Sequence, residues 1–361
     1  AAEIASLAAE ALEPNPFYEP WQLLPALELL APTPPLLVTV RDHQGRLCGF
    51  FPAHLEKKFH GFPIRVLKLW RHEYCFLGTP LLAARDAQYT LVSLMDKLGS
   101  QRAPARIIEW SGVALDGEFW SLLAPVLQGN PAIGVDIVRH ERALLITVEQ
   151  GHANASGKHT KELRRLHRRL ANLGEVRFRA WQPVEDMSPW LHDFLQLEES
   201  GWKGQTGTAL ASQTASREYF SRVLMEGARL DRVQMLALEL NGEPIAMKCN
   251  FLAGKGGFAF KIAYKESHAQ YSPGVLLEQF NVEHVASPVH RIEWMDSCAK
   301  PGHEMIERLW SGRRAIAARL IIGNGAVAGN LVRSMPFLRA ARRFTTKFLK
   351  DHQQAGNLVQ K

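Results

Sequence analysis

Two segments of the chain, far apart in sequence, share one pattern of hydrophobic and polar positions. Leu36–Leu55 and Val233–Leu252 each begin with an apolar run, pass through a short polar turn and continue into a second apolar run. The turn is centred on Gly45 in the first segment and on Asn241-Gly242 in the second. Asn-Gly between two strand-like runs is a strong signal for a β-hairpin. The pattern predicts two hairpins, whose similarity reflects either an internal duplication or chance.

The elements predicted around the hairpins favour a duplication. Helical patterns precede the hairpins at Pro20–Leu30, Met187–Ser200 and Ser216–Gly227, and strand-like runs follow them at Ile64–Trp70 and Gly257–Ile262. The Gly/Ala/Ser-rich stretch Glu149–Gly157 has the composition of a linker. We therefore expect two related α+β domains over residues 1–150 and 151–325, with the chemistry in the second. A basic helical tail over residues 326–361 would follow.

The second half also contains a strand–turn–helix pattern. The apolar run Phe258–Ile262 leads through a polar turn to Ser272-Pro273-Gly274, which opens the apolar stretch Val275–Leu277. The first N–H groups of a helix lack partners within it, and the helix dipole adds to their attraction for an anion such as a pyrophosphate. The alternative is a plain connector, because many strand-to-helix turns contain Pro and Gly.

Composition narrows the class of protein. Of 361 residues, 46% are hydrophobic and 22% are charged, which is typical of a globular chain long enough for two domains. The net charge of +7 favours an anionic partner, namely a phosphorylated cofactor, RNA or a lipid surface. The four cysteines are far apart and form no Cys-x-x-Cys pair, so we expect a cytoplasmic location. No apolar run approaches the roughly 20 residues that span a bilayer.

Two basic segments have the pattern of helices that meet an anionic partner. Lys158–Leu170 carries basic residues at spacings of three and four beside a narrow leucine stripe. This predicts either a solvated helix face or a dock for phosphate groups. Leu331–Leu349 mixes Arg and Lys with Phe and Leu, which is typical of a helix that packs on its own domain, lies on an anionic membrane or binds RNA.

A glycine-rich loop, Gly201–Gly207, follows the helix that ends near Glu199. Within it, Lys203 is suited to contact an anion and Trp202 an apolar or cationic group. The alternative is a plain helix end. The density of glycines around the Trp-Lys pair favours a loop that closes over a ligand.

Proton-transfer candidates gather near the strand–turn–helix. Tyr264, Glu266 and His268 follow the strand closely, and Lys261 interrupts its apolar run, so it lies at an edge or faces a polar site. Asp296 follows the strand-like run Arg291–Trp294, where a carboxylate at a strand end is well placed for a site.

Cys298 and His303 lie shortly after Asp296 and are candidates for a nucleophile pair. One Asp, one Cys and one His at loose spacing fall short of the usual zinc sets, so we expect no metal.

Four motifs taken together resemble the GNAT superfamily of acyltransferases. They are GWKG…GTAL (Gly201–Leu210), FKIAY (Phe260–Tyr264), YSPG (Tyr271–Gly274) and D-x-C-A-x-P-x-H (Asp296–His303). Within the superfamily, the chain looks like the CelD-like acetyltransferases associated with bacterial cellulose biosynthesis. It is also similar to the FemAB peptidyltransferases, which carry two tandem GNAT-like domains. The resemblance covers roughly residues 14–323.

The resemblance implies two tandem GNAT-like domains, each a mixed, mostly antiparallel sheet flanked by helices. It implies transfer from acyl-CoA or acetyl-CoA, or from aminoacyl-tRNA in FemAB relatives, without a metal. The residues that would bind the donor are Phe260, Lys261, Ile262, Gln270, Tyr271, Ser272, Gly274 and Val275. The turn departs from the family pattern Q/R-x-x-G-x-G/A, because Gln270 stands four residues before Gly274 and Leu276 replaces a small residue.

We therefore predict an N-acyltransferase acting on the amine of a small molecule, an amino acid or an amino sugar. Glu266 or Asp296 would be the general base, and His303 is a further catalytic candidate. Lys203 and Lys261 would hold an anionic group of the acceptor or the donor. Trp202, Tyr264 and Glu199 would contact the substrate. The alternatives are an aminoacyl-tRNA-dependent transferase and a non-catalytic domain pair serving polysaccharide synthesis. In the last case the basic tail would contact a partner or a membrane.

Overall fold

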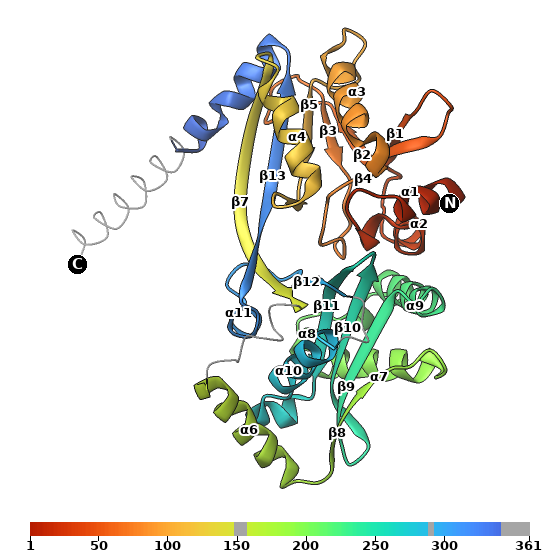
Figure 1. Ribbon diagram of the computed structural model, residues 1–361, viewed down its shortest axis with the longest axis vertical. Helices are drawn as coiled ribbons and strands as arrows, with labels where there is room; N and C mark the ends of the chain where they lie inside the picture. Colours follow the sequence, from red (N-terminus) through yellow and green to blue (C-terminus); the bar gives the residue numbers. More distant parts are fainter. Residues whose placement is uncertain (148–156, 288–291, 341–361) are drawn as a thin grey trace, which may run out of the picture.

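The chain folds around one curled sheet that runs through its whole length (Figure 1). The computed structural model describes residues 1–147, 157–287 and 292–340, so nearly all of the expected linker Glu149–Gly157 lies outside them. Within the described residues the sheet has 13 strands in the order β1-β2-β3-β5-β13-β7-β12-β11-β10-β9-β8, with β4 beside β2 and β6 beside β13. Helices flank it, and the predicted α+β class is confirmed.

The strands are β1 (Leu36–Arg41), β2 (Leu47–Glu56), β3 (Val66–Leu69), β4 (Leu81–Leu82), β5 (Ile107–Trp110), β6 (Val113–Ala114), β7 (Ile133–Ile146), β8 (Val176–Ala180), β9 (Val233–Leu240), β10 (Glu243–Ala253), β11 (Gly256–Tyr264), β12 (Trp294–Asp296) and β13 (Gly312–Asn324). The α-helices are α1 (Ala2–Ala9), α2 (Pro20–Leu29), α3 (Ala87–Gly99), α4 (Glu118–Gln128), α6 (Gly157–Ala171), α7 (Met187–Ser200), α8 (Trp202–Gln205), α9 (Thr214–Arg229), α10 (Pro273–Val285) and α11 (Glu304–Leu309). The 3-10 turns are η1 (Pro16–Tyr18), η2 (Ala84–Asp86), η3 (Leu210–Ser212) and η4 (Glu266–Tyr271), and a further helix spans residues 326–340.

Both predicted hairpins are present, as β1–β2 and β9–β10. In the second, Asn241 and Gly242 have φ angles of 53° and 80°. Left-handed backbone at both central positions matches the twist of the flanking strands, and Asn-Gly adopts it at little cost. Local sequence is therefore enough to specify this turn.

The two halves of the sheet repeat one arrangement. In the first half β1, β2 and β3 are antiparallel neighbours, and β3 then pairs in parallel with β5. In the second half β9, β10 and β11 are antiparallel neighbours, and β11 then pairs in parallel with β12. The same succession of four strands in both halves supports the internal duplication that the hairpins indicated.

Each half is completed by a strand from the other. β7 belongs to the first half by sequence, yet it pairs with β12. β13 belongs to the second half by sequence, yet it pairs with β5 and β6. The two long strands also pair with each other, from Gly312 opposite Leu144 to Asn324 opposite Ile133. This exchange makes one continuous sheet of the two halves (Figure 1).

The halves also share a hydrophobic core. The ring of Phe17, from η1, lies 6.4 Å from Phe251 and 5.9 Å from Phe258, measured between ring centroids. Trp21 of α2 makes an edge contact with Phe251 at 5.5 Å. Edge-to-face geometry at these distances is favourable for aromatic rings, so the first half is packed directly against the sheet that carries the candidate site.

The described part of the basic tail packs on its own protein. Arg333 donates to the carbonyl oxygens of Pro131 and Ile133, and Arg339 forms an ion pair with Asp136 on β7. The other basic residues expected in this tail, from Arg342 onward, lie outside the described residues. Across residues 1–147, 157–287 and 292–340, no helix is both long and apolar enough to cross a bilayer.

Candidate active site

The candidate site begins where β11 and β12 separate. The two strands pair in parallel only from Gly256 opposite Trp294 to Phe258 opposite Asp296. The register between β10 and β11 shifts at this point, which leaves Phe260 as a bulged residue. A bulge bends its strand and increases the local twist. Residues 259–264 therefore continue past the end of β12 and present an open strand edge.

A buried carboxylate that the sequence reasoning missed, Glu198, organises this edge. Its Oε1 accepts hydrogen bonds from Lys203 Nζ at 3.1 Å and Lys261 Nζ at 2.9 Å. Its Oε2 accepts the N–H of Leu210 at 2.8 Å. Lys203 Nζ also donates to the carbonyl oxygen of Ile262, at 2.9 Å. The glycine-rich loop is thus held against β11 by a network of charge-assisted hydrogen bonds.

The charges of Glu198, Lys203 and Lys261 shift the pKa values of Glu198 and Lys203. Burial raises the pKa of Glu198, but the Lys261 and Lys203 charges outweigh burial and hold that pKa below its ordinary value. Burial lowers the pKa of Lys203, and the Glu198 carboxylate partly restores it. One carboxylate facing two ammonium groups leaves the cluster with one net positive charge, which favours an anionic group at the open edge.

The position of Glu198 has a sequence signal. It lies four residues after Phe194 and eight after Trp190, both of which are buried on the apolar face of α7. A carboxylate at such a position points into the fold and requires partners. Glu199, the neighbouring residue that the sequence reasoning chose for substrate contact, is exposed.

Four of the site residues predicted from the sequence lie close together beside this cluster. Trp202, Lys203, Tyr264 and Glu266 line a small cavity of about 20 Å³. Trp202 is 52% exposed, and Glu266 is also exposed. Burial and the neighbouring Glu266 carboxylate raise the pKa of Tyr264, so its phenol stays protonated at neutral pH.

The turn after β11 offers fewer donors than the sequence led us to expect. Ser272 is the N-cap of α10 in left-handed backbone, with a φ of 51°. The N–H groups of Val275 and Leu276 both donate to the Ser272 carbonyl oxygen, at 3.0 and 3.1 Å, and Pro273 has no N–H. The expected row of free N–H groups is therefore wrong for Val275. Gln270, the family-like residue of this turn, is exposed on η4.

The basic helix α6 lies against this turn. The guanidinium of Arg169 is 5.4 Å from the ring centroid of Tyr271, and α6 packs on both η4 and α10 (Figure 1). The predicted leucine stripe is confirmed, because Leu163, Leu166 and Leu170 are buried in the core of the second half. On its other face α6 carries exposed basic residues, including Arg164 and Arg168.

Asp296 is placed differently from the expected general base. Its Oδ2 accepts from Arg142 Nη2 at 2.5 Å and from Arg314 Nη1 at 3.0 Å, and its Oδ1 accepts the Cys298 N–H at 2.8 Å. Burial raises its pKa, but the two guanidinium groups outweigh burial and lower it. A fully buried carboxylate with both oxygens occupied is not available to an amine, so its geometry fits a positioning role beside Phe258.

The remaining candidates do not join the open edge. His303 is exposed immediately before α11 and does not line the cavity beside Lys203. Burial and the charge of Asp296 raise the pKa of the Cys298 thiol well above its ordinary value, so it is not an activated nucleophile. In the part of the chain that the structure describes, no group of three or more His, Cys, Asp or Glu residues is placed to hold a metal ion.

Comparisons with known proteins agree with this architecture. Residues 157–320 match the family model described as "Acetyltransferase (GNAT) domain". One similar solved structure is FemX, at 9% identity and a TM-score of 0.54, which covers 89% of this chain and 95% of that one. Another is the C-terminal domain of a protein assigned as a lysylphosphatidylglycerol synthetase from Agrobacterium fabrum. It has 12% identity and a TM-score of 0.54 and covers 92% of this chain and 94% of that one. A conserved protein of unknown function from Bacteroides thetaiotaomicron, at 10% identity and a TM-score of 0.53, matches over 90% and 97%. A comparison with curated sequences gives no match.

These identities are low, so the three solved structures bear on the fold alone. The family match covers the half that contains β11, α10 and β12, and it defines that half as a GNAT-type acetyltransferase domain. The protein is accordingly an acyltransferase.

Proposed function

We propose that the protein is an N-acyltransferase whose acyl donor lies along the open edge of β11. The observation that supports this most directly is the end of β11–β12 pairing at Phe258 and Asp296. It leaves the backbone of residues 259–264 without β12 as a neighbour on that side, and a strand edge recruits a linear ligand through its N–H and C=O groups. The bulge at Phe260 directs the edge away from β12.

The transfer joins the amine nitrogen of the acceptor to the carbonyl carbon of the donor and breaks the bond from that carbon to its carrier. The amine must lose a proton, and the departing group must gain one. Glu266 is the exposed carboxylate of the cavity, so we assign the proton acceptor to it. Tyr264, which stays protonated, is the proton donor to the departing group.

Lys203 has the role of fixing the edge and stabilising negative charge. Of its three N–H donors, two are used by Glu198 and Ile262 among the described residues. The remaining donor and the net positive charge of the cluster suit an anionic group of the donor or the oxyanion of the tetrahedral intermediate.

The acceptor is proposed to be the amine of a small molecule, an amino acid or an amino sugar, bound at the junction of the two halves. Lys261 Nζ lies 5.6 Å from the ring centroid of Tyr74, a residue of the first half. Burial raises the pKa of Tyr74 to about 12, so this ring remains neutral. Residues from both halves thus border one face of β11, and junctions of this kind are common places for ligand sites.

The carrier of the acyl group is proposed to be coenzyme A, with aminoacyl-tRNA as the second candidate. The second candidate is supported by one observation: two N–H groups at the start of α10 donate to the Ser272 carbonyl oxygen, whereas α6, which carries exposed arginines, packs against η4 and α10. Arginine side chains bind phosphates such as those of a tRNA backbone. A CelD-like role in polysaccharide synthesis and a cytoplasmic location remain part of this proposal, as does membrane contact through the basic tail, residues 326–361.

The proposal is tested by acyl transfer to a panel of amino sugars, amino acids and short peptides. Release of free thiol from acetyl-CoA and from longer acyl-CoAs is followed in one arm, and transfer from charged tRNA with and without ribonuclease in the other. Glu266→Gln and Tyr264→Phe should lower kcat by about 100-fold. Full activity of both variants, in an arm where the wild type is active, contradicts the assignment.

A further inference from the structure

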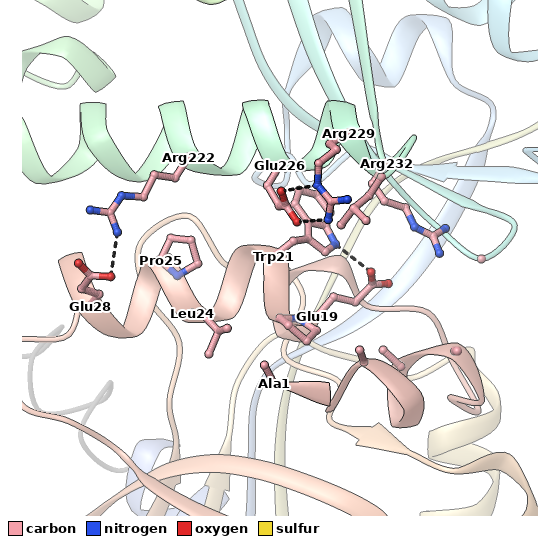
Figure 2. Close-up of a pocket in the computed structure, with 16 residues that line it drawn as sticks. Ala1, Glu19, Trp21, Leu24, Pro25, Glu28, Arg222, Glu226, Arg229 and Arg232 are labelled. Carbon is pink, nitrogen blue, oxygen red and sulfur yellow. Dashed lines mark hydrogen bonds and ion pairs between the residues drawn. The ribbon is translucent and has the colours of Figure 1, made fainter. Parts of the chain in front are cut away.

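A second cavity lies between the two halves, away from the open edge of β11. It measures about 700 Å³ and is bordered by α1, α2 and α9 (Figure 2). Its apolar lining includes Trp21, Leu24, Pro25, Leu230 and alanines of α1. The volume lies within the roughly 300–1,000 Å³ typical of small-molecule sites, which are mostly apolar with a few polar groups.

The polar groups of this cavity are not equivalent. Arg222 is engaged by Glu28 at 2.8 Å and also by Glu218, and Arg229 is engaged by Glu226 at 2.6 Å. Arg232 is half-buried and lines the same cavity, yet within the described residues its guanidinium makes no hydrogen bond or ion pair. Figure 2 shows it apart from these pairs.

One carboxylate, Glu19, lies near Arg232 and attracts it electrostatically. The Glu19 Oε2 atom, however, accepts the indole N–H of Trp21 at 2.8 Å (Figure 2). Arg232 therefore retains its five N–H donors for a ligand, in the planar arrangement that matches a carboxylate or a phosphate.

The cavity is separated from the open edge of β11 by packed rings. Trp21, on its lining, contacts Phe251 at 5.5 Å, and Phe251 contacts Phe260 at 4.6 Å. Phe251 is fully buried and Phe260 nearly so. A molecule held against Trp21 is thus separated from the open edge of β11 by the rings of Phe251 and Phe260.

We propose that this cavity binds an amphiphile with one anionic head group, its apolar body against Trp21, Leu24 and Leu230 and its head on Arg232. The apolar lining selects the body, and the unpaired guanidinium selects the charge of the head. A free fatty acid and a phosphate-headed single-chain lipid share this chemistry. The site is independent of the proposed donor edge, so its occupancy does not rest on acyl transfer.

The test is calorimetric titration of the full chain with three single-chain probes: dodecanoate, dodecyl phosphate and dodecyltrimethylammonium, all below their micelle concentrations. The two anions should bind at one site, and the cation at least about tenfold more weakly, since a charge-assisted hydrogen bond is at stake. A preference for dodecanoate indicates a fatty acid, and a preference for dodecyl phosphate indicates a lipid phosphate.

Variants locate the site. Arg232→Gln should weaken anion binding by about tenfold or more, and Leu24→Glu should weaken it similarly by charging the apolar lining. Arg177→Gln and Leu173→Glu, at exposed positions outside the cavity, are the matched controls and should bind as the wild type does. Circular dichroism verifies that each variant is folded.

Equal binding of the anions and the cation overturns the proposal, and so does unchanged anion binding by Arg232→Gln. The proposal is also overturned if neither dodecanoate nor dodecyl phosphate binds. Because the readout is binding, these outcomes are distinct from failure of the proposed acyl transfer.

Discussion

Arg142 on β7 and Asp296 on β12 form a buried ion pair, 2.5 Å from Nη2 to Oδ2, between strands from different halves of the sequence. Arg314, on the other exchanged strand, shares the same carboxylate oxygen at 3.0 Å. One carboxylate thus holds both exchanged strands at the point where β11 and β12 separate. Asp296 is therefore tied to the integrity of the open edge.

Asp296→Asn should destabilise the protein by about 3–5 kcal/mol, because it leaves the buried Arg142 without its counter-ion and Arg314 with only the partly exposed Asp116. Urea unfolding at neutral pH measures this. Asp116→Asn is the matched control, since Asp116 pairs with Arg314 at 3.2 Å but is 33% exposed. It should cost less than about 1 kcal/mol. An Asp296→Asn variant with wild-type stability and no activity would restore the general-base assignment that the geometry disfavours.

Glu198→Gln should lower both stability and turnover, whereas Glu199→Gln should change neither. The first variant leaves Lys203 and Lys261 without their shared counter-ion and releases the loop that contacts Ile262. The expected loss of stability is about 3 kcal/mol. The neighbouring Glu199 is exposed and does not line the cavity beside Lys203, so it serves as the matched control. Unfolding free energies and kcat are measured for both variants, and equal behaviour of the two would contradict the role given to Glu198.

The free energy of unfolding should decrease as the pH falls, because His72 is protonated more readily in the unfolded chain than in the folded protein. Its ring is buried, and neither nitrogen has a hydrogen-bond partner among the described residues. Burial together with the Arg71 charge lowers its pKa to about 3. In the unfolded chain the pKa is about 6.5. Below that pH the unfolded state binds the proton and the folded state does not, so stability is complete above pH about 6.5 and is lost progressively toward pH about 3.

His72→Phe isolates this effect, because it retains a ring beside Trp70 and Tyr219 and removes the titrating group. Between pH 6 and pH 4 the wild type should lose about 1.4 kcal/mol per pH unit more than His72→Phe. At pH 7 the variant should be at least as stable as the wild type. Parallel slopes for the two proteins, measured by urea unfolding across this range, would show that His72 is accessible to protons in the folded state.

The sequence predicts the local elements well and the exchange of strands poorly. Asn241-Gly242 specifies its hairpin because the turn geometry depends on those two residues alone. β13 mixes apolar residues with three arginines, and this composition alone does not specify which strand it pairs with. Its placement beside β5 rather than within its own half depends on contacts between segments about 200 residues apart. The pattern of hydrophobic and polar residues does not indicate which strand β13 pairs with.

In the site, too, the sequence predicts features that depend on local residues and not those that depend on distant partners. Lys203, Tyr264 and Glu266 were recognisable because they follow loop and strand ends, where polar residues reach a ligand. The role of Asp296 was not recognisable, because its partner Arg142 lies 154 positions away. Glu198 was recognisable in principle from the helical spacing of α7, since a carboxylate on an apolar face requires a partner.

The central claim, that the acyl donor lies along the open edge of β11, is tested most directly by amide hydrogen exchange of residues 259–264. Addition of saturating acetyl-CoA, or of aminoacyl-tRNA if that is the carrier, should slow exchange in this segment and at the start of α10. Exchange in β1 and β2, the corresponding hairpin of the first half, should stay unchanged. Unchanged exchange in residues 259–264 with both carriers, or protection confined to the first half, would contradict the account.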